Sequence, residues 1–232
     1  MLRDGTRILS QAQRAIQAAR AAGREQLTVG FGGSAASGLL PDVLRVFSER
    51  YPSVEVTLRE LRLDGAEDIL DGGVDIAFTR LEPGEVAVEV EVLSREPRVV
   101  ALSVSHPLAR RDSLAFEDLR DESFITNPVV PRAGPPVTWL AEQQRHGLPG
   151  RVAAEAASLQ ETLTLVAAGR GVSLLPGSVA RIHPRSDIRY VEFPDADPAV
   201  VSLAWDRHSG QPAVDAFIRT VRQVAAARHP EA

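Results

Sequence analysis

A glycine-rich loop with hydroxyl side chains, Gly32-Gly33-Ser34-Ala35-Ala36-Ser37-Gly38, is the first feature of the sequence that could bind a ligand. It separates an apolar run at 27–32 from a helical pattern at 39–50, so it predicts a strand-to-helix turn with free backbone N–H groups. These groups and the Ser34 hydroxyl would suit an anion. The loop lacks the G-x-G-x-x-G spacing of dinucleotide-binding turns, and a purely structural turn is the alternative interpretation.

A second helix start with polar groups lies at Ser158-Leu159-Gln160-Glu161. This order fits a capping box, with Ser158 as the N-cap and Glu161 reaching back, and the helix is predicted to end at Gly169. The positive end of such a helix would favour an anion in a crevice beside the sheet, which is where open α/β sheets usually bind ligands.

Enzymatic signatures are missing from the sequence. It has no Cys, and all 26 basic residues are Arg, which excludes a thiolate nucleophile, a lysine Schiff base and a P-loop lysine. There is no H-E-x-x-H or G-x-S-x-G motif, and the acidic pairs Asp68/Asp71 and Glu89/Glu91 are interpreted as solvated surface pairs. The five histidines are scattered: His106, His146, His183, His208 and His229. We therefore expect binding without turnover, with no enzyme activity, no metal and no cofactor.

Length and composition indicate a globular protein. The chain has 232 residues, 44% of them hydrophobic and 25% charged, and a formal net charge of −5. This length permits one large domain or two smaller ones. No apolar stretch is long enough to span a membrane and the N-terminus lacks the apolar core of a signal peptide, so a cytoplasmic location and no membrane partner are expected.

The rest of the chain alternates between strand-like and helix-like apolar patterns. Strands are predicted at 27–32, 54–58, 74–78, 98–103, 123–126, 151–154, 172–175, 188–192 and 200–205. Helices are predicted at 6–22, 39–50, 66–71, 116–119, 137–146, 159–168, 178–182 and 213–228. This alternation predicts two α/β units, the first of them with parallel strands, and extended crossings between the two at 96–102 and 198–205. The helix at 6–22 has a stripe made mostly of alanine, so it needs a partner helix from the body or from a second subunit.

Four stretches, in this order, resemble the effector-binding part of LysR-type transcriptional regulators: LTVGFGGSAASGLLPDVLRVFSERYPSVEVTLREL, LDGGVDIAFTRL, VALSVSHPLARRDSLAFEDLRDESFI and LQETLTLVAAGRGVSLLPGSVA. They cover most of residues 25 to 207. The GGSAAS loop and the FTRL strand end look most like members of the family that sense small aromatic or dicarboxylic acids such as benzoate and muconate.

The resemblance implies an α/β, type 2 periplasmic-binding-protein fold, in which two doubly wound subdomains are joined by two crossing strands. Residues 1–24 would form a linker and dimerisation helix, residues 25–98 and 200–232 subdomain I, and residues 99–199 subdomain II. An organic acid effector would bind in the cleft between the subdomains, and the chain would form homo-oligomers, a dimer or, in the full-length parent, a tetramer. The winged helix-turn-helix of the family is missing before the linker helix, so DNA binding is expected only through that absent domain.

Carried over by position, the resemblance implies effector contacts from Ser34, Ala35, Arg62, Arg80, Thr126, Asn127, Pro128, Leu159 and Gln160. Arg80 follows the strand VDIAF, where benzoate-type sensors often hold a carboxylate; a surface pair with Glu82 is the alternative. Arg62-Leu63-Asp64 stands where relatives place a Ser or Thr, which leaves the identity of the effector open. A solute-binding protein of a transport system shares the fold and is the second hypothesis for the whole chain.

Overall fold

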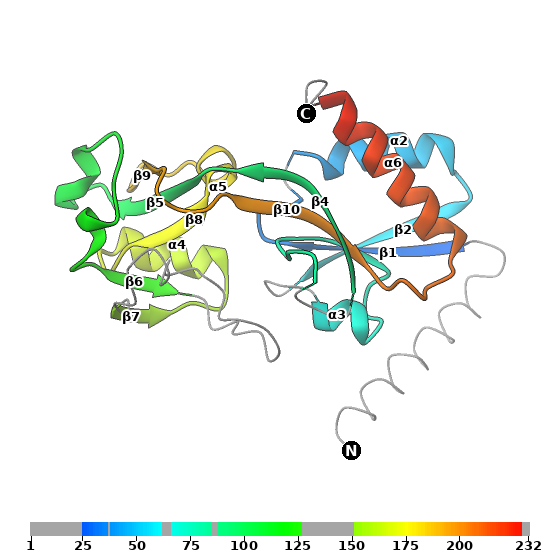
Figure 1. Ribbon diagram of the computed structural model, residues 1–232, viewed down its shortest axis with the longest axis horizontal. Helices are drawn as coiled ribbons and strands as arrows, with labels where there is room; N and C mark the ends of the chain where they lie inside the picture. The colour runs from blue at the N-terminus through cyan, green and yellow to red at the C-terminus, as the bar shows by residue number, and fades with distance from the viewer. Residues whose placement is uncertain (1–24, 37, 62–65, 85–87, 127–150, 229–232) are drawn as a thin grey trace, which may run out of the picture. The chain divides into compact units, whose positions relative to one another are not determined.

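A computed structural model describes residues 25–36, 38–61, 66–84, 88–126 and 151–228 of the chain (Figure 1). The described residues form two compact units. Unit 1 contains those up to Ser94 and those from Val201, and unit 2 is Arg95–Val200. The predicted helices at 6–22 and 137–146 lie outside the described residues. No helix within them is both long and apolar enough to cross a membrane.

Unit 1 is built on a mixed five-stranded sheet in the order β2-β1-β3-β10-β4. Its strands are β1 (Glu25–Gly32), β2 (Val54–Leu61), β3 (Ile76–Thr79), β4 (Glu89–Glu96) and β10 (Ala199–Trp205). β1 pairs in parallel with β2 and β3, as the alternation of strands and helices predicts, whereas β10 runs antiparallel to β3. The carboxyl ends of β1, β2 and β3 therefore meet at one edge of the sheet.

Apolar residues on both faces of this sheet explain why its strands are buried. Helices α2 (Leu40–Arg50) and α6 (Pro212–Arg228) lie side by side and pack on one face, against Ile76 and Phe78 of β3 (Figure 1). Ala77, which points to the other side of β3, belongs to a smaller core with Ile69 of α3 (Ala66–Leu70). A strand covered on both faces needs a continuous apolar run, and the run at 76–78 supplies it.

Unit 2 has a three-stranded antiparallel sheet in the order β8-β5-β9 and a parallel pair β6-β7. The strands are β5 (Arg98–Ser103), β6 (Ser123–Thr126), β7 (Arg151–Glu155), β8 (Ser173–Pro176) and β9 (Ile188–Phe193). Two α-helices, α4 (Leu159–Ala167) and α5 (Gly177–Ile182), and two 3₁₀ turns, η1 (Pro107–Arg110) and η2 (Glu117–Leu119), complete the unit. Alternate residues of β5 belong to two cores, one containing Val100 and Leu102 and the other Val99 and Ala101.

Most of the predicted elements within the described residues are confirmed, but two expectations are wrong. Strand β4 was not predicted, and the first crossing between the units was expected at 96–102. The division instead falls within β4, after Ser94. The second crossing falls within β10, after Val200, as expected. The helix predicted at 116–119 is only the short turn η2. The assignment of residues 1–24 to a linker, 25–98 and 200–232 to subdomain I and 99–199 to subdomain II stays a prediction.

Candidate functional site

Two predicted effector-binding residues, Ser34 and Arg80, meet at the carboxyl edge of the unit 1 sheet. Ser34 lies just beyond β1, and Arg80 is the residue directly after β3. Parallel pairing aligns Phe31 with Phe78, which brings the two strand ends together. The Nη2 atom of Arg80 donates a hydrogen bond of 2.8 Å to the Ser34 Oγ, across a separation of 46 residues.

The loop that carries Ser34 is held closely against the sheet. The Ala35 N–H donates to the Gly32 carbonyl at 2.9 Å, and Gly33 adopts a positive φ of 47°, a conformation that glycine allows without strain. Ser34, Ala35 and Ala36 are buried, with 6%, 2% and 6% of their surfaces exposed. The position of the Ser34 hydroxyl is therefore set by the backbone of the turn.

The pair offers donors for a negatively charged group. A guanidinium keeps its charge at any pH a protein tolerates, and it can donate two parallel hydrogen bonds to a carboxylate. The Ser34 hydroxyl can donate as well as accept. Within the described part of the chain, no group of three or more His, Cys, Asp or Glu side chains could hold a metal ion. The chemistry that this edge supports is anion binding.

The described contacts predicted in unit 2 lie near the start of α4. Its N-cap is Ser158, whose Oγ accepts from the Glu161 N–H at 3.2 Å. Glu161 Oε2 accepts from the backbone N–H of Ala157 at 2.7 Å. In a regular capping box it would accept from the N–H of the N-cap residue, Ser158. Thr126 ends β6, and its carbonyl accepts from the Ala156 N–H at 2.7 Å. The same β6 end and helix start thus hold all three described candidates of unit 2, Thr126, Leu159 and Gln160.

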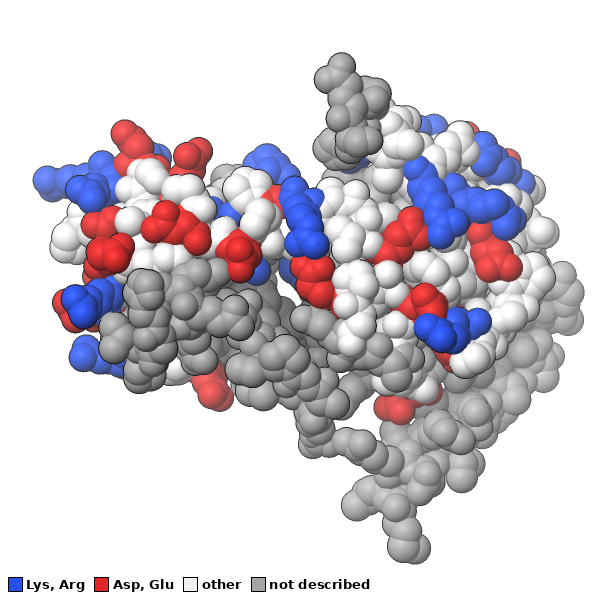
Figure 2. Space-filling view, in the orientation of Figure 1, with Lys and Arg blue, Asp and Glu red and all other residues white. Residues whose placement is uncertain are grey.

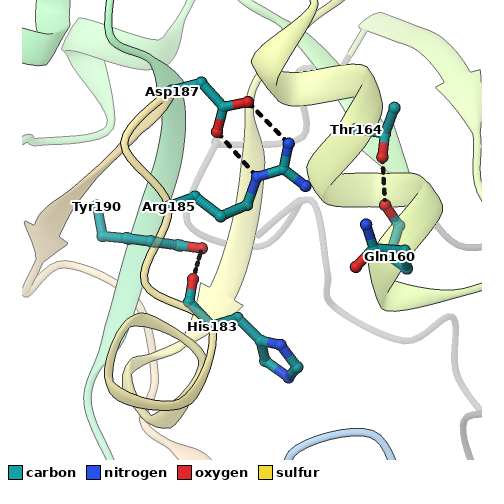
Figure 3. A network of polar contacts seen from close by, with 6 residues as sticks. All are labelled: Gln160, Thr164, His183, Arg185, Asp187 and Tyr190. Atoms are coloured by element: carbon teal, nitrogen blue, oxygen red, sulfur yellow. Dashed lines mark hydrogen bonds and ion pairs between the residues drawn. The ribbon is translucent and has the colours of Figure 1, made fainter.

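These three residues differ in exposure. Gln160 is exposed, Leu159 is half-buried against the core of unit 2, and Thr126 is half-buried. The carbonyl of Gln160 accepts from the Thr164 hydroxyl at 2.8 Å within α4 (Figure 3). The remaining predicted contacts, Arg62, Asn127 and Pro128, lie outside the described residues.

A polar network between α5 and β9 is drawn with Gln160 and Thr164 in Figure 3. Arg185 binds Asp187 through two hydrogen bonds of 2.8 Å, and these lower the pKa of Asp187. Tyr190 donates to the His183 carbonyl at 2.8 Å, and burial raises the pKa of its hydroxyl. The Arg185–Asp187 pair lies within the turn at 183–187, and the Tyr190 bond connects this turn to β9. The network therefore has a structural role.

Charges on the visible face of the molecule are mixed. Figure 2 shows basic and acidic side chains interspersed on this face, without one sign gathered into a continuous area. Among the described residues, several basic and acidic side chains are in direct contact, such as Arg222 with Glu91 at 2.6 Å and Arg111 with Asp118 at 3.0 Å. The described residues drawn on this face form no continuous basic surface of the kind that nucleic-acid binding generally needs.

Sequence reasoning missed one pair of residues next to the site. Thr79 and Ser202 are almost wholly buried, and their hydroxyl oxygens lie 3.0 Å apart. Thr79 directly precedes Arg80 in the chain. Thr79 also directly follows the apolar run VDIAF, a position where burial can be expected. A buried hydroxyl generally has a hydrogen-bond partner, which is the signal the sequence offered. The identity of that partner was not readable, because it comes from a strand 123 residues away.

Comparison with known proteins identifies the family. The LysR substrate binding domain matches residues 20–226 of the chain. The HTH-type transcriptional regulator CatR of Pseudomonas putida is 33% identical over 96% of this chain and 73% of CatR. The regulator BenM of Acinetobacter baylyi is 28% identical over 86% of this chain and 67% of BenM.

Solved structures agree with the sequence matches. The BenM effector binding domain with its effector benzoate has a TM-score of 0.69 and 27% identity, over 88% of this chain and 93% of that chain. Full-length CbnR complexed with its target DNA has a TM-score of 0.73 and 26% identity, over 96% of this chain and 79% of that chain. These matches confirm the predicted type 2 periplasmic-binding-protein fold. The chain therefore belongs to the LysR family of transcriptional regulators, whose substrate-binding domain it contains.

Proposed function

We propose that this chain is the effector-sensing part of a LysR-type regulator and that it binds a small aromatic or dicarboxylic acid through Arg80 and Ser34. The observation that carries the proposal is the 2.8 Å hydrogen bond between Arg80 Nη2 and Ser34 Oγ at the carboxyl edge of the unit 1 sheet. Open α/β sheets generally bind ligands outside this edge. A carboxylate there would accept from the guanidinium, and the Ser34 hydroxyl would turn to donate to it.

The relatives support an acid as the ligand. BenM, whose effector binding domain was solved with benzoate, shares the fold and 27% of its residues with this chain. Its effector combines one carboxylate with an apolar ring, which calls for charged donors and an apolar wall. In this chain the methyl group of Ala35, next to Ser34, would form part of such a wall.

The remaining predicted contacts belong to the same proposal. Ala35 is expected to contact the effector beside Ser34, and Thr126, Leu159 and Gln160 from unit 2. The other proposed contacts are Arg62, Asn127 and Pro128. We infer that the acid is bound and released unchanged, since the relatives named above are transcriptional regulators. Their names favour a regulator over the alternative of a solute-binding protein of a transport system.

Calorimetry tests the proposal directly. A panel of aromatic and aliphatic carboxylates, with benzoate and muconate included, would be titrated into the parent chain, Ser34→Ala and Arg80→Ala. At least one acid should bind with a micromolar to millimolar Kd, and Arg80→Ala should weaken it about 10-fold or more, since a hydrogen bond to a charged group contributes roughly 1.5–3 kcal/mol. Ser34→Ala should have a smaller effect of the same sign.

The control variant is Glu82→Gln, which removes the acidic neighbour that is the alternative partner of Arg80. Binding should survive this change. If an acid binds and both Ser34→Ala and Arg80→Ala leave its Kd unchanged, the assignment of the site is wrong. If the acid is recovered chemically altered, the inference of binding without turnover is wrong instead.

We also propose that the chain associates with copies of itself and contacts DNA only through a separate DNA-binding domain. The alanine-striped pattern at 6–22 supports self-association, since a helix with so small an apolar stripe would need a partner. Sedimentation equilibrium at tens of micromolar should show dimers or larger species, and a strict monomer would contradict the proposal. With a net charge of −5, the chain alone should bind DNA weakly and without sequence preference.

A further inference from the structure

Two buried hydroxyl groups lie next to the Arg80 side of the site. Thr79 of β3 and Ser202 of β10 are direct partners in the antiparallel register, and only 1% and 0% of their surfaces are exposed. Their oxygens lie 3.0 Å apart, which is a hydrogen bond in which either atom can be the donor. Because a buried hydroxyl without a partner is costly, each group restricts the rotamer of the other.

The Thr79 hydroxyl also fixes the backbone on the far side of Arg80. Its Oγ1 accepts from the N–H of Leu81 at 3.3 Å, a local turn in which a side chain bonds to the backbone two residues on. Leu81 is itself buried, with 7% of its surface exposed, in the smaller core of unit 1. Arg80 therefore lies between two buried residues, Thr79 and Leu81, which are connected by the hydrogen bond to the Thr79 hydroxyl.

This arrangement sets the direction in which the Arg80 side chain leaves the sheet. Ser202 holds Thr79, Thr79 holds Leu81, and the backbone of Arg80 lies between them. The guanidinium then reaches Ser34 Oγ at 2.8 Å. An arginine has four side-chain torsions to order, so a fixed starting direction reduces the entropy that is lost when its guanidinium is held at one place.

We propose that the Thr79–Ser202 hydroxyl pair is a positioning pair for the guanidinium of Arg80, and so determines the affinity of the chain for carboxylates. This inference rests on the proposed function, because it assumes that Arg80 receives the acid. Neither hydroxyl touches the ligand. Their effect passes through the backbone of residues 79–81.

The first arm of the test measures binding of benzoate by calorimetry. Thr79→Val keeps the shape of the side chain and removes its hydroxyl. It should weaken benzoate binding about 5-fold or more, because residues in one hydrogen-bond network are energetically coupled. Thr79→Ser restores the hydroxyl and should return the Kd to within about twofold of the parent, a change of less than 0.5 kcal/mol. In an Arg80→Ala background, Thr79→Val should have no further effect.

Thr220→Val is the matched control. Thr220 is also a wholly buried threonine of unit 1, at 0% exposure, but its hydroxyl donates to the Ala216 carbonyl at 2.9 Å within α6. This variant should lower stability and leave the Kd for benzoate unchanged. If Thr79→Val weakens binding no more than Thr220→Val does, or weakens it equally in the Arg80→Ala background, the positioning pair is overturned.

The second arm needs no ligand and separates this inference from the proposed function. In ¹⁵N spectra of the guanidinium groups, the Arg80 signal is assigned by its disappearance in Arg80→Ala. Thr79→Val should speed the rotation of the Arg80 guanidinium, whereas Thr79→Ser and Thr220→Val should leave it as in the parent. A parent that binds no acid but shows this pattern refutes the proposed function, and with it the effect on affinity, while it supports the ordering of the Arg80 guanidinium by the pair. An Arg80 signal unaffected by Thr79→Val refutes the pair whatever binds.

Discussion

Ser34 and Arg80 show how far single residues could be assigned from the sequence. Each follows a strand of a parallel pair, and parallel strands end at the same edge, so their proximity could be predicted before the structure. The hydrogen bond between them agrees with that prediction. The pair of Thr79 and Ser202 could not be predicted, because β10 returns to β3 in an antiparallel sense that no local pattern encodes.

A close approach between Gly171 and β6 in unit 2 gives a prediction at the same scale. A Cβ atom on Gly171 would lie 2.6 Å from the Ser123 carbonyl oxygen, and that oxygen accepts from the Val172 N–H at 2.8 Å. Since β6 cannot move away without losing this bond, Gly171→Ala should lower the free energy of unfolding by about 2–3 kcal/mol, in the range of overpacking. Chemical denaturation monitored by a unit 2 probe measures the change.

Gly169→Ala is the control for this prediction. Gly169 follows α4 at a φ of +67°, but nothing lies within 4 Å of the Cβ position that alanine would add. Only the strain of the left-handed conformation remains, about 1–2 kcal/mol. A Gly171→Ala variant as stable as the parent would contradict the close approach of 171 to β6.

At the scale of elements, the strands with unbroken apolar runs were predicted well and the strand with charges was missed. β4 reads EVEVLSRE, and its glutamates were interpreted as a solvated pair. The structure places Leu93 against the α6 side of the sheet, and Glu91, two residues earlier on the same face, binds Arg222 of α6 at 2.6 Å. The period-two alternation of Val and Glu was the available signal, since a strand exposes alternate residues to different surroundings.

The short turn η2 yields a pH prediction. Asp118 accepts from the Ala115 N–H at 2.9 Å and from Arg111 Nη2 at 3.0 Å. The hydrogen bond from Ala115, with a smaller contribution from Arg111, lowers the pKa of Asp118 in the folded protein. A carboxyl with a lowered folded pKa stabilises the protein above its unfolded pKa, about 4, and that stabilisation is lost as the pH falls through the folded value.

Asp118→Asn should therefore cost stability at neutral pH and progressively less as the solution is acidified. The measurement is the Tm of the parent minus that of the variant, which should be constant from about pH 7 to pH 5 and should shrink below about pH 4. Asp112→Asn is the exposed control, since Asp112 lies 4.0 Å from Arg189 with its side chain fully in solvent. A Tm difference for Asp118→Asn that grows on acidification would contradict the role of its carboxylate.

At the scale of the whole molecule, each unit has its own cores. Unit 1 is centred on Phe217, whose ring packs edge-on at 5.1 Å from Phe47 and 6.4 Å from Phe78. In unit 2, Phe193 packs edge-on at 4.8 Å from Phe116. The composition predicted cores of useful size, but the residues that share a core come from distant parts of the chain and became known only from the structure.

Separate cores predict separate responses to a cavity. Phe217→Ala and Phe193→Ala should each remove about 3–5 kcal/mol of stability from the unit that contains the residue. Native-state hydrogen exchange should show faster exchange in β1 and β3 for the first variant and in β5 and β9 for the second. Equal acceleration in both units by either variant would contradict two separate cores.

The central claim is that Arg80, assisted by Ser34, recognises a carboxylate, and the comparison of an acid with its uncharged amide tests it most directly. Calorimetry would give the ratio of the Kd of benzamide to that of benzoate for the parent and for Arg80→Gln, which retains hydrogen-bond donors and loses the charge. The parent should prefer benzoate by about 10-fold or more, because charge-assisted hydrogen bonds are roughly twice as strong as neutral ones, and Arg80→Gln should lose most of that preference. A parent that binds both compounds equally, or an Arg80→Gln variant that keeps the full preference for benzoate, would contradict the claim.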